Sequence, residues 1–102
     1  MTIRQLYQKS NIVQTKLAVE VMGIRINYYQ LDEGLKYEFN VACDVPFNDA
    51  RQAVLEVVGA MESQSFDHGA QWRRTSFEEE ECTDPRNFYH RFKVGFRVRD
   101  SY

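Results

Sequence analysis

Two segments of this chain, residues 18–45 and 70–99, each carry the alternation of a β-hairpin, and the segment between them has the spacing of an amphipathic helix. The last strand of the second hairpin is the most regular part of the pattern. One phase of it holds Phe88, His90, Phe92, Val94, Phe96 and Val98. The other phase, from Tyr89 to Arg99, is basic apart from one tyrosine and one glycine. Successive side chains of a strand point to opposite faces, so this pattern predicts a sheet with one buried face.

In the first hairpin, a turn at Asp32-Glu33-Gly34 predicts a register that agrees with the apolar pattern. It pairs Tyr28 with Tyr37, Ile26 with Phe39, Ile24 with Val41 and Met22 with Cys43, all on one face. Val19 and Val21 fall on the opposite phase from Ile24. We therefore expect a β-bulge or a sharp bend near Gly23.

The second hairpin has a predicted loop at 82–87, where Asp84-Pro85 supplies the turn chemistry. The resulting register pairs Phe77 with Phe92, Glu78 with Arg91, Ser76 with Lys93 and Trp72 with Arg97. A basic strand thus lies beside an acidic one. Opposite charges across an antiparallel pair contribute roughly 0.2–1 kcal/mol each, so the pairing supports this register.

Between the hairpins, Asn48 or Asp49 can cap a helix that runs to about Ser63. Its apolar stripe contains Ala50, Val54, Val57, Val58 and Met61. This spacing is typical of a helix that lays one face on a sheet. A capping-box pattern at Thr2-Ile3-Arg4-Gln5 also predicts a short N-terminal helix.

These elements predict one α+β domain over residues 1–102, a single-layer ββαββ arrangement with a four-stranded, mainly antiparallel sheet and the helix on one face. The strand order compatible with antiparallel pairing is 2-1-3-4 or 1-2-4-3. No apolar run approaches the roughly 20 residues that span a bilayer, and no signal peptide is visible, so we expect a cytoplasmic protein. With two cysteines there is no disulfide framework, and Cys43 is expected to act as a small buried apolar group.

The face opposite the helix is where we expect a function. Its candidate binding residues are Tyr29, Trp72, Arg74, Tyr89, Arg91, Lys93, Arg97 and Arg99. Tyrosine, tryptophan and arginine are the residues enriched at the centres of protein interfaces. We therefore expect a non-catalytic interaction or regulatory module that binds a protein partner or a second copy of itself.

The alternative is a single-stranded nucleic-acid binder, because bases stack on aromatic rings and phosphates pair with arginine and lysine. The net charge of −2 and the pI of about 5.7 disfavour it. Glu78 and Glu80 also lie among the arginines on the predicted face.

A small-ligand or catalytic protein is a more remote alternative. The five glycines are isolated and form no phosphate-binding loop. Cys43, Cys82, His68 and His90 lack metal-ligand spacing, and His90 lies on the inward phase. Cys82 and His68 lie at opposite ends of a predicted strand and cannot form a catalytic pair. We expect no catalytic residue, no metal and no cofactor.

The run from Glu78 to Glu81 sends alternate carboxylates to both faces. Two buried carboxylates need compensation, for which Arg73, Arg86 and His90 are the candidates, or else the strand reaches the rim of the sheet. We interpret the run as a charged edge that discourages edge-to-edge aggregation. An acidic docking site and a divalent-cation site remain the alternatives.

Overall fold

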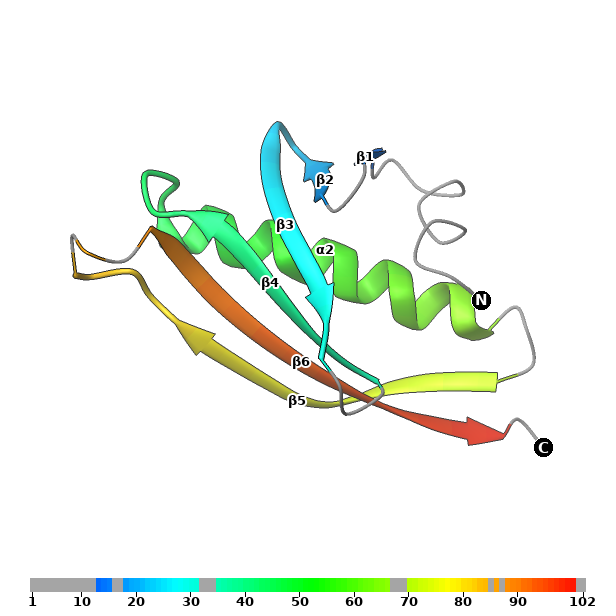
Figure 1. The fold of residues 1–102 in the computed structure, drawn as a ribbon. Helices are drawn as coiled ribbons and strands as arrows, with labels where there is room; N and C mark the ends of the chain where they lie inside the picture. The colour runs from blue at the N-terminus through cyan, green and yellow to red at the C-terminus, as the bar shows by residue number, and fades with distance from the viewer. Residues whose placement is uncertain are drawn as a thin grey trace.

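The computed structural model describes residues 13–15, 18–31, 35–66, 70–84, 86 and 88–100. The described elements are β1 (Val13–Thr15), β2 (Ala18–Val21), β3 (Ile24–Gln30), β4 (Lys36–Ala42), α2 (Phe47–Phe66), β5 (Ala70–Glu80) and β6 (Tyr89–Asp100). Figure 1 shows α2 lying across one face of the sheet only. The class is therefore α+β with the helix on one face, as predicted. The predicted N-terminal helix lies outside the described residues.

The strands form one antiparallel sheet in the order β1-β2-β3-β4-β6-β5. Its four longer strands follow the second of the two predicted orders. β6 lies between β4 and β5, which α2 connects and which run in the same direction. The prediction of four strands was wrong, because the described residues form six.

Of the two additional strands, β2 is separated from β3 by a reversal at Met22-Gly23, and β1 pairs with β2. Both residues have positive φ, at 53° and 76°, as a two-residue hairpin turn requires. Val19 then lies opposite Ile26 and Val21 opposite Ile24, so the two valines share a face with the two isoleucines. The change of phase in the sequence therefore marks a hairpin rather than a bulge within one strand.

The helix supplies six of the seventeen buried apolar residues of the described core. The whole predicted stripe is buried, together with Ala53. Against it pack the inward side chains of the sheet, among them Ile26, Phe39, Val41, Phe92 and Val94, each at most 1% exposed. The helix begins at Phe47, before the two predicted capping residues, because the chain already turns at Pro46, whose carbonyl accepts a hydrogen bond from the Ala50 N–H.

The register of the first hairpin differs from the predicted one by two residues. Tyr28 pairs with Phe39 and Ile26 with Val41, while Tyr29 lies opposite Glu38. The hairpin closes where the Leu31 N–H donates to the Lys36 carbonyl, so its loop is displaced along the chain. A shift of two leaves every side chain on its predicted face.

The register of the second hairpin differs from the predicted register in two ways. Near its loop the register is again shifted by two, so that Phe77 lies opposite Val94 and Glu78 opposite Lys93. A β-bulge between Arg74 and Ser76 then adds one residue, and beyond it Trp72 lies opposite Val98. Because one extra residue reverses the faces, this half of β5 presents the opposite side chains from those predicted.

At the end of the sheet where β6 begins, Cys43 and Cys82 form a disulfide with their Cα atoms 5.7 Å apart. The expectation that Cys43 is a free apolar thiol was wrong, since the strand order brings the ends of β4 and β5 to either side of β6. His90 is buried there: its Nδ1 accepts from the Cys82 N–H at 2.9 Å, and its Nε2 donates to the Val45 carbonyl at 2.7 Å. The histidine is a buried core residue, as predicted for an inward position, and it has two hydrogen bonds where one was expected.

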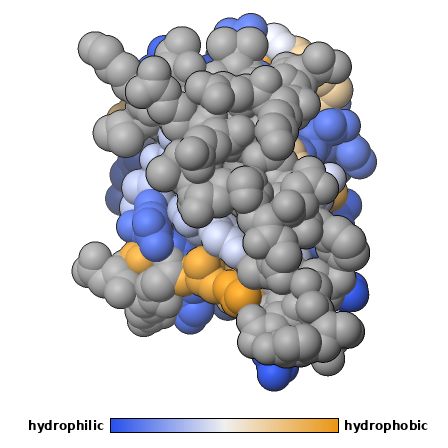
Figure 2. Space-filling view, turned by 90° about the vertical axis from the view of Figure 1, so that its right-hand side faces the viewer, coloured by the Kyte–Doolittle hydropathy of each residue, from blue (hydrophilic) through white to orange (hydrophobic). Residues whose placement is uncertain are grey.

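The described surface differs by region. Seen from the side that lies at the right of Figure 1, many of the coloured atoms are hydrophilic, and the most apolar atoms gather low in the view (Figure 2). Within the described part of the chain, no helix has the length and apolar character needed to span a membrane.

Candidate interaction face

The face of the sheet opposite α2, hereafter the open face, consists of aligned polar rows. It carries Arg25, Asn27 and Tyr29 of β3, Lys36, Glu38 and Asn40 of β4, Tyr89, Arg91, Lys93, Gly95 and Arg97 of β6, and Arg73, Ser76, Glu78 and Glu80 of β5. The central row is Tyr29, Glu38, Lys93 and Glu78, each directly opposite the next. Charge therefore alternates across three strands, which favours their pairing.

Glu38 is buried within this row and is only 7% exposed, although it faces away from the core. Its carboxylate accepts a hydrogen bond from the Tyr29 hydroxyl. That bond raises the pKa of Tyr29 above its usual value, and partial burial and the negative charge of Glu38 add to the increase. The positive charge of Arg91 lowers the pKa but does not cancel the increase. The phenol is thereby held in its protonated, donating form, with the tyrosine still 45% exposed.

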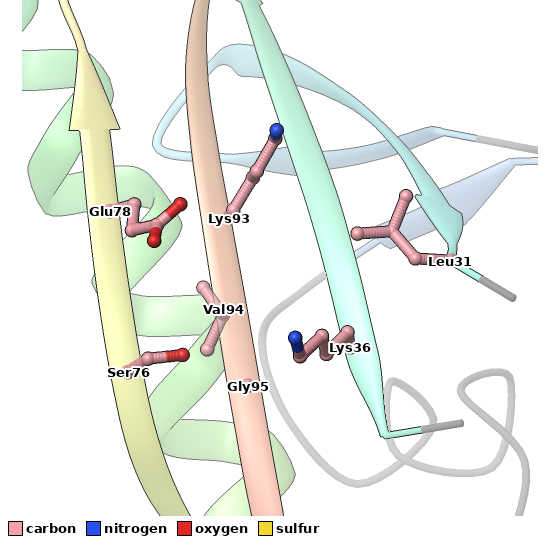
Figure 3. Close-up of a pocket in the computed structure, with 7 residues that line it drawn as sticks. All are labelled: Leu31, Lys36, Ser76, Glu78, Lys93, Val94 and Gly95. Atoms are coloured by element: carbon pink, nitrogen blue, oxygen red, sulfur yellow. The ribbon is translucent and has the colours of Figure 1, made fainter. Parts of the chain in front are cut away.

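The next row, Leu31, Lys36, Gly95 and Ser76, contains a hollow of about 400 Å³. Gly95 on this row is buried because neighbouring side chains fill the space above it: a Cβ there would lie 2.7 Å from Ser76 Oγ and 3.2 Å from Thr75 Oγ1. Figure 3 shows the Ser76 and Lys36 side chains directed toward each other over Gly95, with Lys93 and Glu78 on the adjacent row. Charged and polar side chains line the hollow together with the apolar Leu31 and Val94.

Beyond the hollow, Arg97 of β6 lies directly opposite Arg73 of β5. Both belong to the open face, because their neighbours Phe96, Trp72 and Arg74 belong to the helix face. Like charges directly opposite each other destabilise an antiparallel pair. Two arginines therefore lie side by side on adjacent strands at this corner of the face.

The predicted site residues divide between the two faces. Tyr29, Tyr89, Arg91, Lys93 and Arg97 lie on the open face, as expected. Arg99 belongs to β6, but its side chain is outside the described ones.

The sequence pattern predicted Trp72 and Arg74 on the open face, and this prediction was wrong, because both lie on the helix face. Trp72 packs on Phe96 with ring centroids 5.6 Å apart and contributes to the core. Arg74 pairs with Glu62 of α2 at 3.9 Å and lies over the Phe77 ring. The bulge beside Thr75 causes both exchanges and puts Arg73 on the open face instead.

Several residues of the face were not among the predicted site residues, including Lys36, Glu38, Arg73, Ser76 and Gly95. For Gly95 a signal was present, since it is the one small residue on the otherwise basic and aromatic phase of β6. Ser76 was already on this face through its predicted pairing with Lys93. For Arg73 the signal was absent, because a bulge at Thr75 leaves no distinct pattern in the sequence.

The glutamate run lies at the exposed edge of β5. Glu78 and Glu80 face the open side, and Glu79 pairs with Arg51 of α2. The compensating cation is thus a helix residue rather than Arg73, Arg86 or His90. Among the described residues, no group of three or more histidine, cysteine, aspartate or glutamate side chains is arranged to hold a metal ion.

Comparison of the chain with known protein families, with characterised proteins and with solved structures gave no match.

Proposed function

We propose that the protein is a non-catalytic interaction module that binds another protein, or a second copy of itself, through the open face. The observation that carries the proposal is the composition of this face: two half-exposed tyrosines, Tyr29 and Tyr89 at 45% and 42%, stand among arginine and lysine on a rigid sheet. Tyrosine gives a large contact area at low cost in conformational entropy, and arginine donates several hydrogen bonds in a fixed geometry.

The buried Glu38 also supports the proposal that the open face binds a protein. Covering a carboxylate on an outward face costs free energy unless hydrogen bonds compensate for the lost water. Here the Tyr29 hydroxyl supplies one such bond and thereby fixes the position of the tyrosine ring. A ring held in place before binding loses little freedom when a partner covers it, which favours tight association.

The nucleic-acid alternative is weaker on this geometry. Trp72, the residue best suited to stacking on a base, packs against the core, and the Tyr29 hydroxyl is bonded to a carboxylate. Glu38, Glu78 and Glu80 place negative charge along the path of a bound strand. Phosphate binding depends on a continuous cationic surface, and this face is mixed.

The proposal is tested by photo-crosslinking from the two sides of the molecule. Benzoylphenylalanine replaces Tyr89 on the open face in one variant and Glu56 on the exposed side of α2 in a control. Irradiation in cell extract and of the purified protein should give a defined heavier product from position 89 and none from position 56. A product of twice the chain mass identifies self-association. Equal labelling from both positions, or no product from position 89, would refute the proposal.

A further inference from the structure

β5 is an edge strand of the sheet, and it is long for an edge strand. Its eleven residues pair with β6 on one side, and no other described strand pairs with it on the outer side. Figure 1 shows β5 and the short β1 at opposite edges of the sheet. The main-chain N–H and C=O groups along such an edge can pair with a strand of another chain.

The β-bulge between Arg74 and Ser76 limits which strand can pair along the whole of this edge. A Cβ on Gly95 would lie 2.7 Å from Ser76 Oγ and 3.2 Å from Thr75 Oγ1, so these two consecutive side chains point to the same, open face. Directly opposite residues of an antiparallel pair lie on one face of the sheet. A regular strand can therefore match β5 on one side of the bulge only, whereas a strand with the same bulge can match it on both sides.

A second copy of this chain supplies a strand with the same bulge. Two β5 strands can lie antiparallel about a two-fold axis, with Thr75 of each copy opposite Ser76 of the other. In this register Arg73 lies opposite Glu78 of the other copy, and both belong to the open face. The faces match in the same way along the remaining residues on both sides of the bulge.

The charges of β5 favour the same arrangement. Arg73 and Arg74 precede the bulge, and the three glutamates at 78–80 follow it. Antiparallel pairing places the cationic half of each strand beside the acidic half of the other, whereas parallel pairing places like charges side by side. The contacts within each copy are retained, since Lys93 still lies opposite Glu78.

One flank of α2 runs beside this edge. Arg51 pairs with Glu79, and Glu62 lies 3.9 Å from Arg74, so the helix and β5 run in opposite directions along each other. Leu55 belongs to the same flank, one turn after Arg51, and is partly exposed. When two β5 strands pair with matching faces, both helices lie on the same side of the joined sheet with these flanks toward each other.

We propose that the protein forms a two-fold symmetric dimer through its β5 edges, so that the sheet continues from one copy into the other. This interface is separate from the open face, and the inference does not depend on the proposed function. The open faces of the two copies become one continuous surface. The assembly closes at two copies, because β1, the other edge of the described sheet, has only three residues.

The test is sedimentation equilibrium of the purified chain over a wide range of concentrations. Arg73→Glu and Glu78→Arg each place like charges opposite each other at two symmetric positions, and each should weaken the dimer about tenfold. An equimolar mixture of the two variants should form a heterodimer with close to wild-type affinity, because opposite charges again lie across from each other at both positions. Arg25→Glu makes the same charge change on β3, away from the edge, and should leave the affinity within twofold.

Hydrogen exchange of the wild-type protein gives a second readout that needs no substitution. Amides of β5 should exchange more slowly as the protein concentration rises, because their outer groups pair in the dimer. A protein that is monomeric at every concentration, a dimer that neither charge reversal weakens, or a mixture that fails to regain affinity would overturn the proposal. Equal weakening by Arg25→Glu would show general charge repulsion and would overturn it as well. Crosslinking from position 89 tests the open face separately, so either proposal can fail without the other.

Discussion

The two faces of the sheet come from alternate residues of the same strands, yet different requirements shape them. On the helix face Phe39 and Phe92 have no exposed surface, and α2 covers them. On the open face a carboxylate is buried beside an exposed tyrosine, two arginines lie opposite each other, and a hollow lies beside them. Packing explains the first face completely. The second contains features that cost stability, and such features concentrate where a protein binds something.

The largest expected difference between the faces is at neighbouring residues of β6. Phe92→Ala should lower the free energy of unfolding by about 3–5 kcal/mol, because it empties a fully buried ring position between α2 and the sheet. Lys93→Ala, one residue away on the open face, should change it by less than about 1 kcal/mol. Urea denaturation of both variants measures the two values. Equal losses would mean that the faces are misassigned.

Trp72 and Tyr89 provide the next comparison, since both are aromatic and only one packs on the core. Trp72→Ala should cost about 2 kcal/mol of stability through its lost contact with Phe96, and should leave open-face crosslinking unchanged in the folded fraction. Thermal unfolding gives the stability. If Trp72→Ala instead abolished crosslinking without loss of stability, Trp72 would belong to the open face, and this would contradict the bulge in β5.

Each face also holds a tyrosine with a raised pKa, Tyr29 through its hydrogen bond to Glu38 and Tyr37 through burial. A pKa that is higher in the folded state favours the neutral phenol there. This contribution to stability is complete below the unfolded-state value of 10.0 and is lost as pH rises through the folded-state pKa.

We therefore expect the free energy of unfolding to decline above pH 10, and Tyr29→Phe and Tyr37→Phe each to remove part of that decline. Denaturation curves below and above pH 10 measure it, with tyrosinate absorbance following the phenols. A decline that is identical in the wild type and Tyr29→Phe would contradict the bond to Glu38.

The smallest effect is expected at a turn that belongs to neither face. Met22 is exposed and has positive φ, a conformation that asparagine adopts more readily. Met22→Asn should raise the free energy of unfolding by about 0.5 kcal/mol. Chemical denaturation can resolve this gain, and a loss of stability would argue against the two-residue turn.

Sequence periodicity predicted the faces more reliably than the register. Phe92 and Val94 were assigned inward from their alternation alone, and a register shift of two in either hairpin leaves that assignment intact. The helix stripe from Ala50 to Met61 was equally readable, because its spacing depends on local geometry.

What could not be predicted depends on contacts between distant segments or on a single inserted residue. The bulge next to Thr75 moved Trp72 and Arg74 to the helix face, although the local sequence shows no break. The Cys43–Cys82 disulfide depends on the strand order, for which the sequence left two possibilities. The hollow at Gly95 required the register of three strands at once.

The central claim is that the open face binds a partner, and that its exposed side chains serve this binding and not the stability of the fold. Arg91 offers the most direct test. With a photo-crosslinker in place of Arg91, the yield of the partner or dimer product is measured in the wild-type background and with Tyr89→Ala. Tyr89 and Arg91 lie on the same face of β6, and neither contributes to the core. We predict that Tyr89→Ala reduces the yield severalfold while the free energy of unfolding changes by less than about 1 kcal/mol. An unchanged yield, or a yield that falls only as the protein unfolds, would contradict the account.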